Sequence, residues 1–176
     1  MQILLTPNTL ASLLRLLART QPLEGVIVEL GVFQGGALKR MAEAVPEKWC
    51  YGFDTFTGQP EDSWREGDFH KPGEFADTSM DGVWSEMPGN VILMPGWFPE
   101  SASGFDHAIA FAHVDMDLEK STEDAIEWLK PRMVPGGIAV FDDWGWKNCP
   151  GVAKAITRAA LPVVRSEVHQ CYWTAP

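Results

Sequence analysis

The chain has 176 residues, a formal net charge of −10 and an apolar share of 45%. This length suits one domain, so we expect a single unit over residues 1–176. The acidic balance argues against nucleic acid and anionic membranes as partners, because both are held by clusters of lysine and arginine. No apolar run in the sequence is long enough to cross a bilayer. Three widely spaced cysteines without a C-x-x-C pair fit a reducing, cytoplasmic location.

The first 24 residues could be mistaken for a signal peptide. They have no basic beginning, however, and Arg15 and Arg19 interrupt the apolar run. Leucines recur at the spacing of one helix face, at positions 10, 13, 14 and 17. This spacing predicts an amphipathic N-terminal helix over residues 1–24.

From residue 25 onward, short apolar runs alternate with helical patterns. The expected strands are residues 25–30, 50–54, 90–96, 107–115, 138–143, 162–168 and 170–175. Strands that are apolar on both faces and alternate with helices indicate a parallel sheet covered on both sides. The last two runs are close enough to predict a hairpin. The expected fold is therefore α/β, with a mostly parallel seven-stranded sheet, helices on both faces and a C-terminal antiparallel hairpin.

One helical pattern stops before Pro131, and its Ser121 and Asp124 are spaced as a capping box. Residues 134–137, VPGG, then predict a turn into the next strand. Residues 57–90 break the alternation, since they are rich in glycine, proline, aspartate and tryptophan. So long a stretch with weak periodicity is usually functional, and we expect it near the acceptor site, with one short helix at 80–87.

In open parallel sheets, ligands bind beyond the carboxyl ends of the strands, where the strand order reverses. The first strand ends in VELGVFQGG, which contains Glu29, Gly31, Gly35 and Gly36. Glycines let a ligand approach the backbone, and the following helix offers N–H groups to an anion. This pattern differs from the dinucleotide fingerprint, and Glu29 suits the ammonium group of S-adenosylmethionine. The alternative is that the glycines serve only a tight turn.

Asp54 ends the second strand, where its carboxylate could take both hydroxyls of a ribose. The alternative is an ordinary loop carboxylate. Thr55 follows it directly, and Gly96 and Trp97 follow the third strand. We include these three residues in the expected cofactor site, with the face of Trp97 as a platform for adenine.

Two acidic pairs follow the fourth and fifth strands: Asp115 with Asp117, and Asp142 with Asp143. Residues two apart in an extended chain point the same way, and the ends of neighbouring strands lie about 5 Å apart. Carboxylates this close repel one another, and a divalent cation removes the conflict. Oxygen ligands without histidine or cysteine predict Mg²⁺, or Ca²⁺ or Mn²⁺, rather than Zn²⁺. The alternative is that one pair caps a turn and Asp117 is solvated.

Five motifs in this order resemble the macrocin O-methyltransferase (TylF/MycF-like) family: ELGVFQGGALKRMA, YGFDTFTG, GWFPES, HVDMDLEKSTEDAIEWLKPRMVPGG and FDDWGW…CPG. The similarity covers residues 25 to about 160. Members of this family are class I S-adenosylmethionine-dependent methyltransferases with a Rossmann-like fold. They use Mg²⁺ to methylate sugar hydroxyls on antibiotics.

The resemblance implies that Asp115, Asp142 and Asp143 are the metal ligands and that Asp117 is the base. It also implies that residues 29–36 hold the methionine part of the cofactor and that Asp54 binds the ribose. The implied partner is a small hydroxylated acceptor, without nucleic acid or membrane, and a homo-oligomer is left open.

Two features depart from the family pattern. The chain is shorter before the first strand, where members carry lid and oligomer-forming elements, and Glu119 stands where an aromatic residue is expected. His70 in the long loop and His113 on the fourth strand are rival bases, because aspartate is a weak base with a pKa of about 3.9. We expect His113 to be a core histidine whose hydrogen bonds are satisfied, and His70 to be a surface residue.

The leading hypothesis is a Mg²⁺-assisted O-methyltransferase that acts on a hydroxyl of a small molecule, such as a sugar of a glycosylated natural product. A metal-dependent hydrolase or phosphatase on a similar sheet is an alternative, and it would need no nucleoside pocket. A non-catalytic module that binds the cofactor without a working acceptor site is a second alternative.

Overall fold

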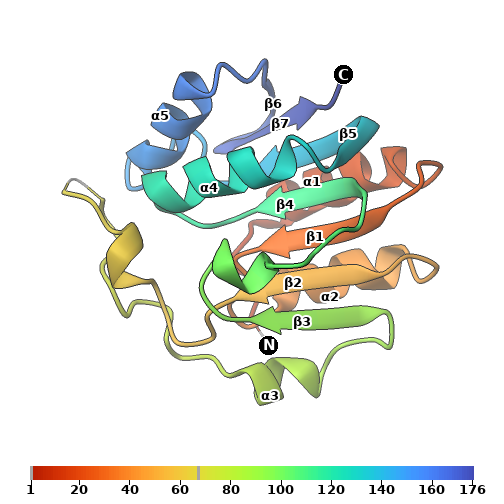
Figure 1. Ribbon diagram of the computed structural model, residues 1–176, viewed down its shortest axis with the longest axis horizontal. Helices are drawn as coiled ribbons and strands as arrows, with labels where there is room; N and C mark the ends of the chain where they lie inside the picture. Colours follow the sequence, from red (N-terminus) through yellow and green to blue (C-terminus); the bar gives the residue numbers. More distant parts are fainter. Residues whose placement is uncertain (1, 67) are drawn as a thin grey trace.

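The computed structural model describes residues 2–66 and 68–176. One seven-stranded sheet runs through it in the order β3-β2-β1-β4-β5-β7-β6 (Figure 1). The first five strands are mutually parallel, whereas β7 runs antiparallel to β5 and β6 antiparallel to β7. The strands are β1 (Val26–Leu30), β2 (Cys50–Asp54), β3 (Val91–Pro95), β4 (Ile109–Val114), β5 (Met133–Phe141), β6 (Val164–Glu167) and β7 (Gln170–Thr174). The predicted fold class is confirmed.

Helices cover both faces of the sheet. In Figure 1, α4 and α5 lie in front of the sheet, and α1 and α2 lie behind it. The two faces carry separate apolar cores, one that contains Leu13 and Leu38 and one that contains Ile126 and Ile156. The helices are α1 (Pro7–Arg19), α2 (Gly36–Ala44), α3 (Met80–Trp84), α4 (Glu119–Leu129) and α5 (Pro150–Arg158), with short 3-10 turns η1 (Glu61–Ser63) and η2 (Glu100–Ala102). Among the described residues, no helix is long and apolar enough to span a membrane.

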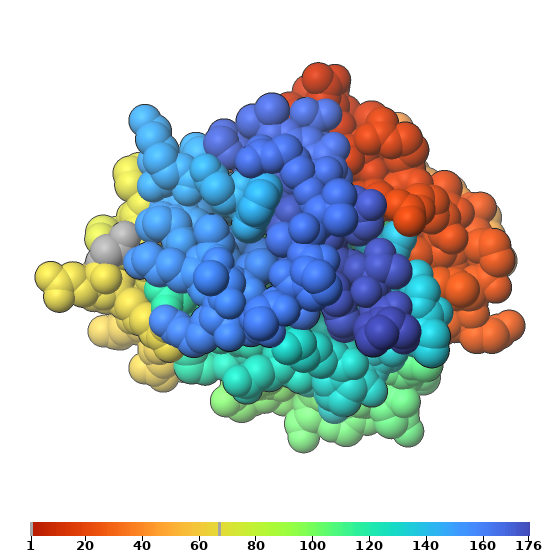
Figure 2. All heavy atoms as spheres, turned by 90° about the horizontal axis from the view of Figure 1, so that it is seen from above, coloured from red at the N-terminus to blue at the C-terminus, as the bar shows by residue number. Residues whose placement is uncertain are grey.

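The N-terminal helix is shorter than predicted. It begins at Pro7, because the side chain of Thr6 accepts a hydrogen bond from the Thr9 backbone N–H and closes the first turn. Residues 2–6 precede it outside any helix and lie along the pocket described below. The space-filling view in Figure 2 shows the N-terminal part of the chain (red) beside the C-terminal part (blue). Residues of the long loop (yellow) lie at the opposite edge of the molecule, on the left.

Two local predictions were wrong, and a third was confirmed only in part. The capping box does not form, because α4 begins at Glu119 and its N-cap is the buried Leu118, which places Ser121 inside the helix. Residues 134–137 are part of β5, where the pairing with β4 shifts register and Gly136 has a φ of +80°. The expected turn is therefore a bulge within a longer strand. The short helix α3 ends at Trp84, three residues earlier than predicted.

The strand order reverses beside β1. From β1 the chain adds β2 and β3 on one side, and β4 and β5 on the other. The carboxyl ends of all five parallel strands meet at one edge, and the gap at the reversal is where open α/β sheets bind ligands.

Gly31 allows two parts of that edge to come together. Its φ is +89°, and a Cβ atom on it would lie 1.9 Å from the backbone oxygen of Asp115. Only a residue without a side chain leaves room for the segment after β4 to pack against the end of β1. Gly73 has a similar φ of +81°, but a Cβ atom there would meet nothing within 4 Å.

These two glycines give a matched pair of variants. We expect Gly73→Ala to lower the free energy of unfolding by about 1 kcal/mol, through backbone strain alone. Gly31→Ala should lower the free energy of unfolding by about 2 kcal/mol more than Gly73→Ala does, because the backbone atoms around it must also move apart. Urea denaturation of both variants measures the difference, and equal losses would contradict the close packing.

Candidate active site

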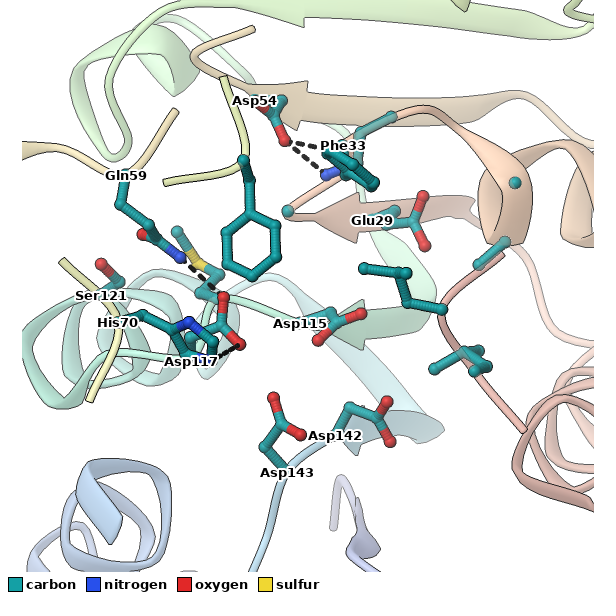
Figure 3. A pocket seen from close by; sticks show the side chains of 18 of the residues that line it. Glu29, Phe33, Asp54, Gln59, His70, Asp115, Asp117, Ser121, Asp142 and Asp143 are labelled. Atoms are coloured by element: carbon teal, nitrogen blue, oxygen red, sulfur yellow. Dashed lines mark hydrogen bonds and ion pairs between the residues drawn. The ribbon is translucent and has the colours of Figure 1, made fainter. Parts of the chain in front are cut away.

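Four carboxyl groups converge at the carboxyl edge of the sheet. β4 and β5 are paired so that Val114 lies next to Phe141, and an acidic pair follows each strand. Side-chain oxygens of Asp115, Asp117 and Asp143 lie within 4.8 Å of one another, and Asp115, Asp142 and His113 form a second such group. Figure 3 shows these carboxylates directed toward a common space. The structure therefore brings together the four aspartates that the sequence singled out.

The route by which they meet differs from the prediction. β4 ends at Val114, and Asp117 has a φ of +59°, so the segment that carries Asp115 and Asp117 is a tight turn rather than an extended strand. Asp143 also has a φ of +59°. Non-glycine residues rarely adopt this left-handed conformation, and such strain gathers at functional sites.

The clustering makes all four groups hard to ionise. Burial raises the pKa of Asp115 well above its ordinary value, and the nearby charges of Asp142 and Asp143 raise it further. The pKa of Asp117 is raised by burial and then by Asp115 and Asp143. For Asp142, burial and the charge of Asp143 raise the pKa to about 7, and burial also raises the pKa of Asp143. These directions are those of like charges held together in a site shielded from water.

No lysine or arginine in the described part of the chain forms an ion pair with any of these aspartates. Their neutral partners include two side-chain amides and the thiol of Cys149, which donates to Asp117 Oδ1 at 3.7 Å. Gln59 Nε2 donates to Asp117 Oδ2 at 2.6 Å, and Gln170 Nε2 donates to Asp142 Oδ1 at 3.3 Å. Amides orient carboxylates without cancelling their charge. A set of carboxylate oxygens without a protein cation fits a hard divalent ion.

The loop after β1 is held by Asp54. Its Oδ2 accepts hydrogen bonds from the backbone N–H groups of Val32 (2.7 Å) and Phe33 (2.8 Å), and its Oδ1 accepts one from Phe56 (2.7 Å). A carboxylate offers about four acceptor positions, so three are already used. The binding of a ribose by Asp54 stays a prediction, and about one further acceptor position is left for it.

Glu29 lies buried at the end of β1, with 1% of its surface exposed. Its Oε1 is 2.8 Å from His113 Nδ1, whereas its Oε2 has no hydrogen-bond partner among the described residues. Burial, and then the charge of Asp54, raises the pKa of Glu29 well above its ordinary value. His113 is completely buried, as predicted, but its hydrogen bonds are not all satisfied, because its Nε2 has no partner among the described residues. A buried carboxylate oxygen that lacks a donor suits a ligand that carries one, such as an ammonium group.

One pocket of about 520 Å³ joins these groups, a volume typical of small-molecule sites. Of the expected cofactor residues, Trp97 and Gly35 do not line it. The side chain of Trp97 is 49% exposed, and Phe98 lines the pocket in its place. Gly35 is the N-cap of α2, with a φ of +80°. The expected residues that do line the pocket are Glu29, Gly31, Gly36, Asp54, Thr55, Gly96, Asp115, Asp117, Asp142 and Asp143.

The long loop supplies part of the pocket wall. Gln59, His70 and Phe75 line the pocket from residues 57–90. The prediction that His70 is a surface residue was wrong, because its exposure is only 9%. Neither the contact of Gln59 with Asp117 nor the burial of His70 has a signal in the sequence, since a loop's path depends on tertiary contacts.

Glu119 anchors this loop. Its carboxylate lies 3.2 Å from Arg65 of the loop and 2.9 Å from Arg158 of α5, and the same two arginines also pair with Glu123. The residue that departs from the family pattern therefore joins the loop, α4 and α5 in one ionic cluster.

Comparison with known proteins identifies the class to which this fold and site belong. Residues 28–144 match the family described as "Methyltransferase domain". This match covers most of the chain, and the protein belongs to the methyltransferase domain family.

Two curated relatives are O-methyltransferases. One is the 8-demethyl-8-(2,3-dimethoxy-alpha-L-rhamnosyl)-tetracenomycin-C 4'-O-methyltransferase of Streptomyces olivaceus, to which the chain is 30% identical over 145 residues. The aligned region covers 71% of this chain and 55% of that protein. It is 29% identical over 171 residues to the mycinamicin III 3''-O-methyltransferase of Micromonospora griseorubida, covering 83% of the chain and 59% of that protein. The chain thus spans a little over half the length of these relatives.

A solved structure supports the fold. The O-methyltransferase NovP superposes with a TM-score of 0.79 at 24% identity, over 94% of this chain and 78% of that one. The Rossmann-like methyltransferase architecture expected from the resemblance is confirmed.

The raised pKa values predict how stability depends on pH when no divalent cation is bound. The pKa of Asp142 is about 7 in the folded chain, and an unfolded aspartate titrates near about 3.9. The folded state therefore binds this proton more tightly, and the free energy of unfolding falls as the pH rises from about 4 to 7. If the folded cluster holds Mg²⁺, added Mg²⁺ should restore the loss at neutral pH, because a ligand of the folded state alone stabilises it. Urea denaturation in EDTA or in Mg²⁺ measures both effects.

Two variants separate this site from the other titrating groups. Asp142→Asn should show a shallower fall with pH and a smaller gain from Mg²⁺. Asp106→Asn, at an exposed position, should behave like the unmodified chain. If the free energy of unfolding of Asp142→Asn fell with pH as steeply as that of the unmodified chain, and Mg²⁺ stabilised neither, the proposed repulsion would be contradicted.

Proposed function

We propose that the chain is an S-adenosylmethionine-dependent O-methyltransferase that uses Mg²⁺ to methylate a hydroxyl of a small molecule, such as a sugar of a glycosylated natural product. One observation carries the proposal: in a single pocket, an acidic edge from β4 and β5 adjoins the glycine loop and buried glutamate of β1. The relatives named as O-methyltransferases of glycosylated compounds support it. We also propose that the chain belongs to the macrocin O-methyltransferase branch, that it forms one domain and that it acts in the cytoplasm.

The β1 side of the pocket fits S-adenosylmethionine. The free Oε2 of Glu29 can accept a hydrogen bond from the cofactor's ammonium group. Asp54 can accept one ribose hydroxyl while it keeps the loop in place. Thr55, Gly96 and Phe98 line the adjoining wall, where the ring of Phe98 replaces Trp97 as the aromatic surface for adenine.

The β4–β5 side fits a divalent cation. Asp115, Asp142 and Asp143 offer carboxylate oxygens, and no protein cation pairs with them among the residues that the structure describes. Bound Mg²⁺ would lower the pKa of a coordinated acceptor hydroxyl, which as a free alcohol holds its proton about as tightly as water does. Ca²⁺ and Mn²⁺ prefer similar oxygen ligands, and we assign Mg²⁺ from the family resemblance.

The chain's own residues then do three things. Glu29 and the glycine loop orient the methyl donor along the edge of the sheet. Asp115, Asp142 and Asp143 would hold the cation, which would supply a Lewis acid for the acceptor hydroxyl. Asp117 adds negative charge beside the acceptor hydroxyl, which favours departure of the proton. Alignment of two reactants in this way removes much of the entropic barrier to displacement.

Calorimetry with S-adenosylmethionine separates the two halves of the site. Glu29→Gln should weaken cofactor binding by about 10-fold or more, because it replaces a charged hydrogen bond by a neutral one. Asp142→Asn should leave cofactor affinity nearly unchanged, as should Glu86→Gln on the surface. Absence of any binding heat at millimolar cofactor would refute the proposed function.

Turnover is tested by mass spectrometry of methyl transfer to a panel of vicinal diols and sugar glycosides. We expect a methylated product with Mg²⁺, and Asp142→Asn or EDTA should reduce its rate by about 100-fold or more. Product that forms equally well in EDTA would remove the metal from the mechanism. Cofactor binding without any transfer would favour a non-catalytic module instead.

A further inference from the structure

The long loop delivers a histidine to the acidic edge. His70 is 9% exposed, and its ring lies 5.0 Å from the ring of Phe75 and 6.2 Å from that of Trp146. All three residues line the pocket. Figure 3 shows the imidazole beside Asp117, on the side away from Asp142. Burial of a histidine in a loop requires a well-defined contact, and the structure provides one at the ring nitrogen Nδ1.

Glu74 sets the state of this imidazole. His70 Nδ1 lies 2.7 Å from Glu74 Oε2, and a hydrogen bond from His70 lowers the pKa of Glu74. An ionised carboxylate only accepts hydrogen bonds, so Nδ1 carries the hydrogen atom. In the neutral ring the other nitrogen, Nε2, is then an acceptor with a free lone pair. Nε2 is buried and has no hydrogen-bond partner in the described part of the chain.

The free nitrogen faces the place expected for the acceptor. Nε2 lies 3.9 Å from Asp117 Oδ1, a distance too long for a hydrogen bond. Because neighbouring atoms cover Nε2, a hydroxyl oxygen about 2.8 Å from both atoms requires a small outward movement of the loop when the acceptor binds. A hydroxyl at that point would also lie at the edge formed by Asp115, Asp117 and Asp143.

Asp117 is less suited to remove the proton. Gln59 already donates to its Oδ2 at 2.6 Å, and the thiol of Cys149 lies 3.7 Å from its Oδ1. A carboxylate next to a bound cation is also a weaker base than an imidazole. Its negative charge can nevertheless stabilise a protonated imidazole beside it.

We propose that His70, oriented by Glu74, is the general base of the methyl transfer, an assignment that rests on the proposed function. The acceptor O–H bond breaks and its proton moves to Nε2, while the oxygen forms a bond to the methyl carbon. The carbon–sulfur bond breaks, and its electron pair stays on sulfur. Glu74 on Nδ1 and Asp117 beside Nε2 flank the imidazolium that results, and its proton later leaves to water. The arrangement parallels the carboxylate–histidine pair of serine hydrolases.

The first test needs no acceptor. Nitrogen-15 NMR of the chain's four histidines reports which ring nitrogen carries hydrogen. The spectrum of His70→Gln assigns the His70 signals. We expect hydrogen on Nδ1 and a bare Nε2 in the unmodified chain, and a shift toward hydrogen on Nε2 in Glu74→Gln. Hydrogen on Nε2 in the unmodified chain would overturn the proposal, whatever the chain's activity.

The second test measures turnover with the best acceptor from the diol and glycoside panel. His70→Ala should lower kcat by about 100-fold or more, and added imidazole should restore at least about 10-fold, because it can enter the vacated space. His70→Gln, which keeps the volume, should lose the same activity without a change in cofactor affinity. The exposed His107→Gln should keep full activity.

The outcomes distinguish failure of the proposed methyltransferase function from failure of the assignment of His70 as its base. If the unmodified chain methylates no acceptor, the proposed function fails, and the NMR result still reports on the histidine. If the unmodified chain is active but His70→Gln keeps its rate, or imidazole rescues nothing in a folded His70→Ala, then His70 is not the base.

Discussion

The whole account depends on the electrostatic repulsion among four aspartates at one end of the sheet. Two buried, neighbouring strands each end in an acidic pair, and the backbone at Asp117 and Asp143 adopts a left-handed conformation to bring the pairs together. Burial raises the pKa of all four, and the charges of neighbouring aspartates raise the pKa of Asp115, Asp117 and Asp142 further. Without a cation this arrangement weakens the fold, so its presence is explained by a ligand that carries positive charge.

The rest of the site is organised around that edge. Gly31 lets the segment that carries Asp115 pack directly against the end of β1, and Asp54 ties the glycine loop to the end of β2. Under the proposed function, cofactor and cation would therefore bind to connected parts of one edge of the sheet. The opposite wall is a loop, which the ionic cluster of Arg65, Glu119 and Arg158 fastens to the helices. Enzymes on this type of sheet commonly bind the cofactor at the rigid edge of the sheet and the acceptor against a loop.

Much of the fold could be predicted from sequence, because buried parallel strands and amphipathic helices have distinct periodicities. All seven strands lie where the apolar runs indicated, and the order of acidic residues at their ends was enough to place the aspartates. The misses share a cause. The start of α4, the bulge at Gly136 and the burial of His70 are decided by contacts with distant segments. Trp97 shows the same limit, since a position after a strand does not determine which way a side chain turns.

The most direct test of the central claim is a titration with Mn²⁺ followed by electron paramagnetic resonance, because Mn²⁺ favours the same oxygen ligands as Mg²⁺. The account predicts about one tightly bound ion per chain, with affinity reduced by about 10-fold or more when Asp115 or Asp143 is changed to asparagine. A chain that binds no Mn²⁺ tightly, or that binds it equally well after both substitutions, would contradict the view that these carboxylates are gathered to hold a cation.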